Sequence, residues 1–116
     1  MNLNDQNAGL KAEKLAVTYL INNGLKLMAQ NYHCRFGEID LVMTDAATLV
    51  FIEVRLRSNH YFGDAAASIT PQKQHKLQLT AQHYLQQVNS LPACRFDVIL
   101  MNKNDIQAII WLKNAF

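Results

Sequence analysis

The sequence contains little cysteine, since Cys34 and Cys94 are the only two among its 116 residues. They have neither the spacing of metal ligands nor a secretory context, so we expect two reduced thiols rather than a disulfide. Long hydrophobic runs are missing as well, because no apolar stretch approaches the roughly 20 residues that a transmembrane helix needs. Residues 1–7 also lack the basic and apolar regions of a signal peptide. These absences predict a cytoplasmic protein that does not act at a membrane.

A strong excess of one charge is absent too. The 11 Lys and Arg residues nearly balance the 9 Asp and Glu residues, and a net charge of +2 does not by itself indicate nucleic-acid binding. Four of the acids are candidates for one site: Glu13, Glu38, Asp40 and Glu53. If they gather there, the remaining surface is more basic than the total suggests. A hydrophobic content of 50% without repeats or linkers favours one globular domain, residues 1–116.

The central feature of the sequence is a predicted β-hairpin. Residues 36–44 and 49–57 alternate with period two and are rich in aliphatic side chains, and a four-residue connection, 45–48, joins them. Counted outwards from one closing pair, the register places four pairs on the same, more polar face: Thr44 with Leu49, Val42 with Phe51, Asp40 with Glu53 and Glu38 with Arg55. The other face is apolar throughout and should lie on a core: Ile39, Leu41, Met43, Val50, Ile52, Val54 and Leu56.

This register puts the carboxylates of Asp40 and Glu53 side by side. Directly opposed strand residues have Cβ atoms roughly 5 Å apart, and like charges at that separation destabilise the pair. A divalent cation would offset the repulsion, and hard oxygen ligands on rigid strands suit Mg²⁺ or Mn²⁺. The alternative is a solvated face on which Glu38 pairs with Arg55 and Asp40 points to water.

Residues 8–23 read as a helix, with Asn4, Asp5 or Asn7 as the N-cap and Gly24 as the stop. On the helical wheel Glu13 falls well inside the apolar arc. A buried, unpaired carboxylate is costly, so Glu13 needs a metal-bound water, a cation or a protein donor as its partner. The alternative is a glutamate that snorkels from the helix edge.

Residues 25–34 are a further candidate strand, and residues 58–69 are long enough for a functional loop. Arg55 and Arg57 stand at the root of this loop, which carries His60 and two aromatic residues. Such a loop can contact phosphates and stack on exposed bases. An ordinary surface loop is the alternative, and His60 alone proves nothing.

Thr70 and Pro71 are a strong helix start, and the helix should run to about residue 88. Its first turns present Lys73, Gln74 and Lys76 together with the positive end of the helix dipole, an arrangement suited to a phosphate. Solvated lysines are the alternative. Residues 95–101 and 106–112 are two more strands around a turn at 102–105. A crossover through the helix makes the strand at 95 parallel to the strand at 49, giving a mixed sheet in a single α/β fold.

Four segments together resemble the YraN family of small bacterial proteins: Glu13 on the first helix, Gly37-Glu38-Ile39-Asp40, Glu53-Val54-Arg55, and Thr70-Pro71-Gln72-Lys73-Gln74. That family is similar to the PD-(D/E)xK nucleases with a restriction-endonuclease-like fold, especially archaeal Holliday-junction resolvases. The resemblance covers residues from about 8 to 112. It implies a single nuclease-like domain with a mixed sheet of about five strands and flanking helices.

The resemblance also implies roles for particular residues. Asp40, Glu53 and the carbonyl of Val54 would bind Mg²⁺ or Mn²⁺, and Glu13 would contribute through water or a second metal. Arg55 takes the position of the motif cation, and Gln74 lies near a helix position where some relatives carry a functional glutamine. The implied activity is metal-dependent endonucleolytic hydrolysis of DNA, branched, single-stranded or duplex.

Arg55 departs from the superfamily pattern, which usually has lysine there. Arginine stays protonated and cannot act as a base, although it still stabilises negative charge. Two other functions therefore stay open. One is a weak or inactive module that holds nucleic acid with five side chains: Arg55, Arg57, His60, Lys73 and Lys76. The other is a protein-interaction domain in DNA repair or recombination. The sequence is also compatible with a homodimer.

Overall fold

The computed structural model describes residues 3–57, 69–103 and 105–116. In chain order, the elements are α1 (Leu3–Asn22), β1 (Lys26–Cys34), β2 (Gly37–Asp45), β3 (Thr48–Arg57), α2 (Pro71–Leu85), β4 (Cys94–Asn102) and β5 (Asp105–Leu112). The strands form one sheet in the order β1-β2-β3-β4-β5. Only β3 and β4 run parallel, as the crossover through α2 requires, and the other neighbours are antiparallel. The α/β class and the mixed five-stranded sheet are thus confirmed.

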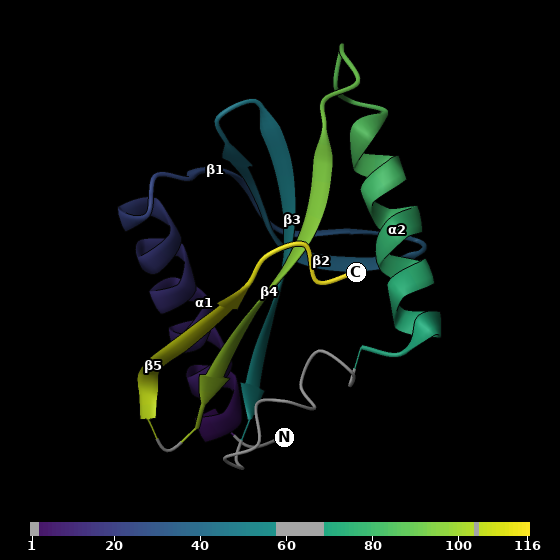
Figure 1. The fold of residues 1–116 in the computed structure, drawn as a ribbon. Helices are drawn as coiled ribbons and strands as arrows, with labels where there is room; N and C mark the ends of the chain where they lie inside the picture. Colours follow the sequence, from purple (N-terminus) through teal and green to yellow (C-terminus); the bar gives the residue numbers. More distant parts are fainter. Residues whose placement is uncertain (1–2, 58–68, 104) are drawn as a thin grey trace.

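The sheet lies between the two helices (Figure 1). On one face, α1 buries Ala12, Ala16 and Leu20 against alternate residues of the central strands. On the other face, α2 buries Leu77 and Ala81 against the remaining set. This second set includes Val42 and Phe51, so the expectation that their side of the hairpin is the polar one is wrong for these two residues. Within the described residues, neither helix is long and apolar enough to cross a membrane.

The helix ends follow local sequence signals only in part. Thr70 is the N-cap of α2, where its Oγ1 accepts from the N–H of Lys73 at 3.2 Å, and Pro71 is the first helical residue, as predicted. Gly24, at φ 95°, follows the end of α1, also as predicted. However, α1 begins at Leu3, so the three predicted N-cap candidates lie inside the helix. The helix α2 ends at Leu85, three residues before the predicted position, because the backbone turns at residues 86 and 87.

The β2–β3 hairpin has the predicted register at its closed end, where Thr44 pairs with Leu49 and Val42 pairs with Phe51. The ladder continues through Asp45 and Thr48, so the connection has two residues and not four. In the other direction, the backbone pairing ends at Leu41 and Ile52. The predicted pairs of Asp40 with Glu53 and of Glu38 with Arg55 are therefore not ladder pairs.

Beyond Leu41, β2 leaves β3 but stays paired with β1 as far as Gly37 and Cys34. We call this divergence of β2 from β3 the fork. The first residues of β2 approach α2: a Cβ at Gly37 would lie 3.3 Å from Thr80 Oγ1. Ile39 accordingly packs in the core under α2, although the sequence pattern placed it on the face of Leu41. The fork thus opens the sheet beside the start of α2.

Candidate functional site

Asp40 lies at the fork, and its side chain forms a hydrogen bond to β3 where the backbone ladder between β2 and β3 has ended. Its Oδ2 accepts from the backbone N–H of Val54 at 2.8 Å. Burial raises the pKa of the Asp40 carboxyl and the charge of Glu38 adds to this, while the Val54 hydrogen bond and Arg55 act in the opposite direction. The backbone N–H of Val54 therefore fixes one carboxylate oxygen of Asp40 at the fork.

Glu53 is the second carboxylate at the fork, with its side chain 21% exposed. It is hydrogen-bonded to Asp40, so the two acids are in contact although their backbones are not paired. Burial, followed by the charge of Asp40, raises the pKa of Glu53 to about 7, against the effects of Arg55 and Lys73. The shared hydrogen bond raises the pKa of Glu53 and lowers that of Asp40.

Glu13 approaches these acids from α1, half-buried, and its partner is the side chain of Asn31 on β1. With its nitrogen oriented toward the acids, the Asn31 amide donates to Glu13 Oε1 at 2.8 Å and to Glu38 Oε1 at 3.1 Å. Burial raises the pKa of Glu13, and the charges of Asp40 and Glu38 raise it further. One neutral amide thus holds two acids of this cluster together.

Three basic side chains face the acids across an open cleft of about 300 Å³, which is lined by Gly37, Glu38, Glu53, Arg55, Lys73, Lys76 and Leu77. Arg55 Nε lies 3.8 Å from Glu53 Oε1. Among the described residues, this buried Nε has no hydrogen-bond partner. A buried donor without a partner costs free energy, so Arg55 is placed to donate to an anionic ligand.

The structure does not bring every predicted site residue to this cleft. Gln74 donates its side-chain amide to the carbonyl of Ile69 at 3.0 Å, which ties down the approach to α2. Arg57 ends β3, where its carbonyl accepts from the N–H of Lys103 at 2.6 Å, and it is not among the residues that line the cleft. His60 lies outside the described residues.

Glu38 is among the candidate acids predicted from the sequence, but Asn31, whose amide contacts both Glu13 and Glu38, was missed. Asn31 adopts φ 50°, a left-handed conformation that asparagine tolerates better than most residues. Asparagine is uncommon in β-strands, so an asparagine within a predicted strand is a weak sign of such a bend. Nothing in the sequence indicates that its amide reaches Glu13.

The donor chemistry at the fork fits a hard divalent cation. Asp40 and Glu53 offer oxygen atoms from adjacent side chains, and burial raises the pKa of both. A cation between them would offset the charge of Asp40, which raises the pKa of Glu53 further. Over residues 3–57, 69–103 and 105–116, no group of three or more His, Cys, Asp or Glu is arranged to hold a metal ion. Mg²⁺ is commonly bound through only one or two carboxylates together with water and substrate phosphate, so the fit of the site to such a cation rests on Asp40 and Glu53 alone.

Fold and site together define an α/β protein with a carboxylate cluster and facing cations at a fork in its mixed sheet. The chain matches the model of the family described as uncharacterised protein family UPF0102, over residues 12–101. It therefore belongs to the UPF0102 family, the YraN family that its motifs resemble.

Several bacterial relatives share most of the chain. A UPF0102 protein of Methylobacillus flagellatus is 57% identical over 108 residues, which cover 93% of this chain and 95% of the relative. A UPF0102 protein of Psychromonas ingrahamii is 52% identical over 108 residues, covering 93% and 88%. A third, from Nitrosospira multiformis, is 50% identical over 108 residues, covering 93% and 91%. The match thus spans both helices that carry the candidate site.

Proposed function

We propose that this protein is a metal-dependent DNA endonuclease whose centre is the carboxylate pair at the fork. The observation that carries the proposal is the contact between Asp40 and Glu53, two partly buried acids fixed beside Arg55. Keeping such a pair together is unfavourable for the fold alone, and strongly perturbed acids in a cleft are typical of functional sites. We expect the protein to act on DNA in the cytoplasm.

Asp40 and Glu53 would hold Mg²⁺ or Mn²⁺, with the carbonyl of Val54 as a further ligand and Glu13 acting through water. A bound divalent cation supplies the acidity that ionises a water molecule and the charge that polarises a phosphate. Val54 holds Asp40 in position through its N–H. Carboxylates bind a cation in their ionised form, so a divalent cation held between the two acids would lower the pKa of Glu53.

The phosphate would lie against Arg55, Lys73 and Lys76. The buried Nε of Arg55 gains the hydrogen-bond acceptor that the described residues do not provide. Because guanidinium remains protonated, Arg55 stabilises charge on the phosphate and takes no part in proton abstraction. The two lysines line the same cleft and add phosphate contacts near the start of α2.

A cleavage assay tests the proposal. Purified protein is incubated with labelled branched, single-stranded and duplex DNA, with Mg²⁺, with Mn²⁺ and with a chelator. Asp40→Asn should abolish metal-dependent cleavage, whereas Asp105→Asn, at an exposed acid that begins β5, should not change it. Cleavage that survives Asp40→Asn would overturn the assignment of the centre.

DNA binding without cleavage is the second candidate function, and the arginine at position 55 favours it. Arg55, Lys73 and Lys76 bind phosphate whether or not the acids support hydrolysis. In the same assay, salt-dependent retention of uncleaved DNA that Arg55→Ala weakens would identify this function.

A further inference from the structure

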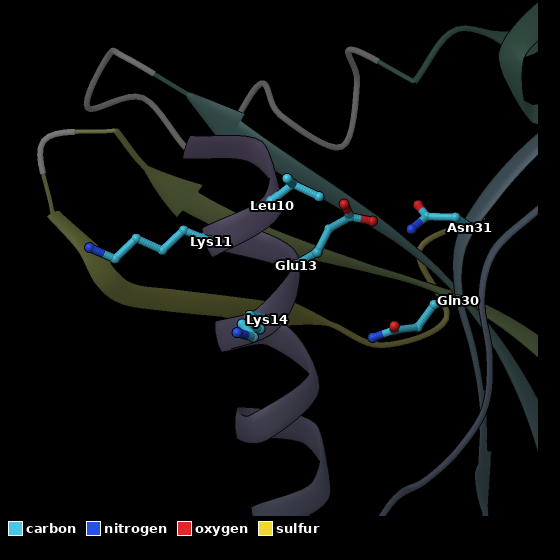
Figure 2. A pocket seen from close by; sticks show the side chains of 6 residues that line it. All are labelled: Leu10, Lys11, Glu13, Lys14, Gln30 and Asn31. Carbon is cyan, nitrogen blue, oxygen red and sulfur yellow. The ribbon is translucent and has the colours of Figure 1, made fainter. Parts of the chain in front are cut away.

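A second hollow lies on the other side of Glu13, between α1 and β1. This groove has a volume of about 480 Å³, larger than the cleft, and is lined by Leu10, Lys11, Glu13, Lys14, Gln30 and Asn31. Figure 2 shows Glu13 on the helix directed toward Asn31, with the side chain of Leu10 above it and that of Gln30 below. Volumes of roughly 300 to 1,000 Å³ are typical of sites for small ligands.

The groove and the cleft adjoin at Asn31. Its amide nitrogen contacts Glu13, which lines the groove, and Glu38, which lines the cleft. The two hollows are therefore close enough to be considered as neighbouring parts of one binding surface. Because the nitrogen of Asn31 is engaged with the acids, its Oδ1 is the atom that it offers to a ligand.

The charges around the groove select the kind of group that enters it. Lys11 and Lys14 are exposed and lie about one helical turn apart, where each can contact a phosphate. Glu13 also lines the groove, so a phosphate placed beside its carboxylate would be repelled. An uncharged group must occupy the interior while phosphates stay near the lysines.

The polar and apolar surfaces of the interior match a nucleobase. Leu10 is 63% exposed and presents an apolar surface to the face of a base. Gln30 and Asn31 supply amide groups for the base edge, the hydrogen-bonding chemistry by which proteins read unstacked bases. In a duplex the bases are stacked and paired, so only an unpaired nucleotide can enter such a hollow.

We propose that the groove binds one unpaired nucleotide next to the phosphodiester held in the cleft, so that the substrate is DNA with a single-stranded segment. This proposal rests on the proposed function, in which the cleft binds a DNA phosphodiester. It adds the class of DNA substrate, one with an unpaired nucleotide beside that phosphodiester. It assigns Leu10, Gln30 and Asn31 to the base and Lys11 and Lys14 to the flanking phosphates.

Fluorescence anisotropy with a labelled single-stranded oligonucleotide and a matched blunt duplex tests the groove. Leu10→Glu adds a negative charge to the groove and should weaken single-strand binding about tenfold, within the range measured for the loss of one base contact. Duplex affinity should fall much less. Ile21→Glu is the matched control, because Ile21 is an exposed residue on the same helix, 48% exposed, that does not line the groove. Leu10→Ser removes the apolar surface without adding a charge. It should therefore lower the single-strand affinity less than Leu10→Glu does, again with little change in duplex affinity.

The salt dependence gives a second readout. Replacing Lys11 and Lys14 together by alanine should flatten the slope of log affinity against log salt by about 1.4 for a single strand. Because both lysines are exposed, thermal melts should not change.

The outcomes separate the groove from the cleft. If Leu10→Glu and Ile21→Glu have equal effects while Lys73→Ala weakens all DNA binding, the groove is not a nucleotide site and the proposed function stands. If the wild-type protein binds no DNA form at low salt, or ignores changes at Arg55 and Lys73, both proposals fail.

Discussion

Replacing Glu53 by glutamine should change how the stability of the protein depends on pH. Burial and the charge of Asp40 raise the pKa of Glu53 from 4.5 to about 7. Between these values the folded protein holds a proton that the unfolded chain has released, so the free energy of unfolding decreases as the pH rises. The stabilisation is complete below pH 4.5 and is lost as the pH passes 7. At about 1.4 kcal/mol per pH unit, this gap in pKa sets an upper limit of about 3.5 kcal/mol on the change in the free energy of unfolding.

Urea denaturation at a series of pH values from 4.5 to 8.5, with chelator present, measures this effect. The wild-type protein should lose stability across the range, whereas Glu53→Gln should lose much less and should exceed the wild type at pH 8.5. Asp105→Asn, at an exposed acid away from the fork, should follow the wild-type curve. If the free energy of unfolding has the same pH dependence in the wild type and in Glu53→Gln, the prediction is wrong, because Glu53 then titrates alike in the folded and unfolded states.

Three further predictions concern the residues around the fork. Glu13→Gln keeps the shape and hydrogen bonding of the side chain while removing a strained charge, so the melting temperature should hold or rise while any cleavage rate falls; an unchanged rate would exclude Glu13 from the site. Asn31→Gly keeps φ 50° accessible but removes the side-chain amide, so the free energy of unfolding, measured by chemical denaturation at pH 8, should fall by about 1 kcal/mol. An unchanged denaturation midpoint would contradict the hydrogen bond between Asn31 and Glu13. Lys73→Ala with Lys76→Ala should flatten the salt slope for duplex DNA by about two, whereas Arg57→Ala, outside the cleft, should flatten it less; equal effects in titrations at four salt concentrations would contradict this division.

The parts of the fold that local sequence signals determine could be predicted. The register of Thr44 with Leu49 follows from alternation, because a slip by one residue would turn every apolar side chain to the wrong face. The start of α2 follows from Thr70 and Pro71, whose side chains act within one helical turn. The start of α1 was not predicted correctly, because Asn4, Asp5 and Asn7 are all capping residues by type and the helix begins before them, at Leu3.

The fork could not be predicted because it depends on contacts between distant segments. The side chain of Asp40 accepts a hydrogen bond from the backbone N–H of Val54 where the ladder between β2 and β3 is interrupted. The alternation of apolar and polar residues in the sequence cannot show such a contact. Gln74 had a suitable position, but its amide is used by the carbonyl of Ile69. The contact of Asn31 with Glu13 joins a strand and a helix, and it requires both the backbone bend at Asn31 and the placement of α1 on the sheet. The sequence therefore predicts which acids are unusual more readily than it predicts their partners.

We expect the carboxylates of Asp40 and Glu53 to bind a divalent cation together. Calorimetric titration of the protein with Mn²⁺, in the presence of a non-cleavable DNA oligomer, tests it whether or not hydrolysis follows. We expect saturable binding of modest affinity that Asp40→Ala abolishes and Asp105→Ala preserves. Binding of the same affinity and stoichiometry in Asp40→Ala would contradict the claim.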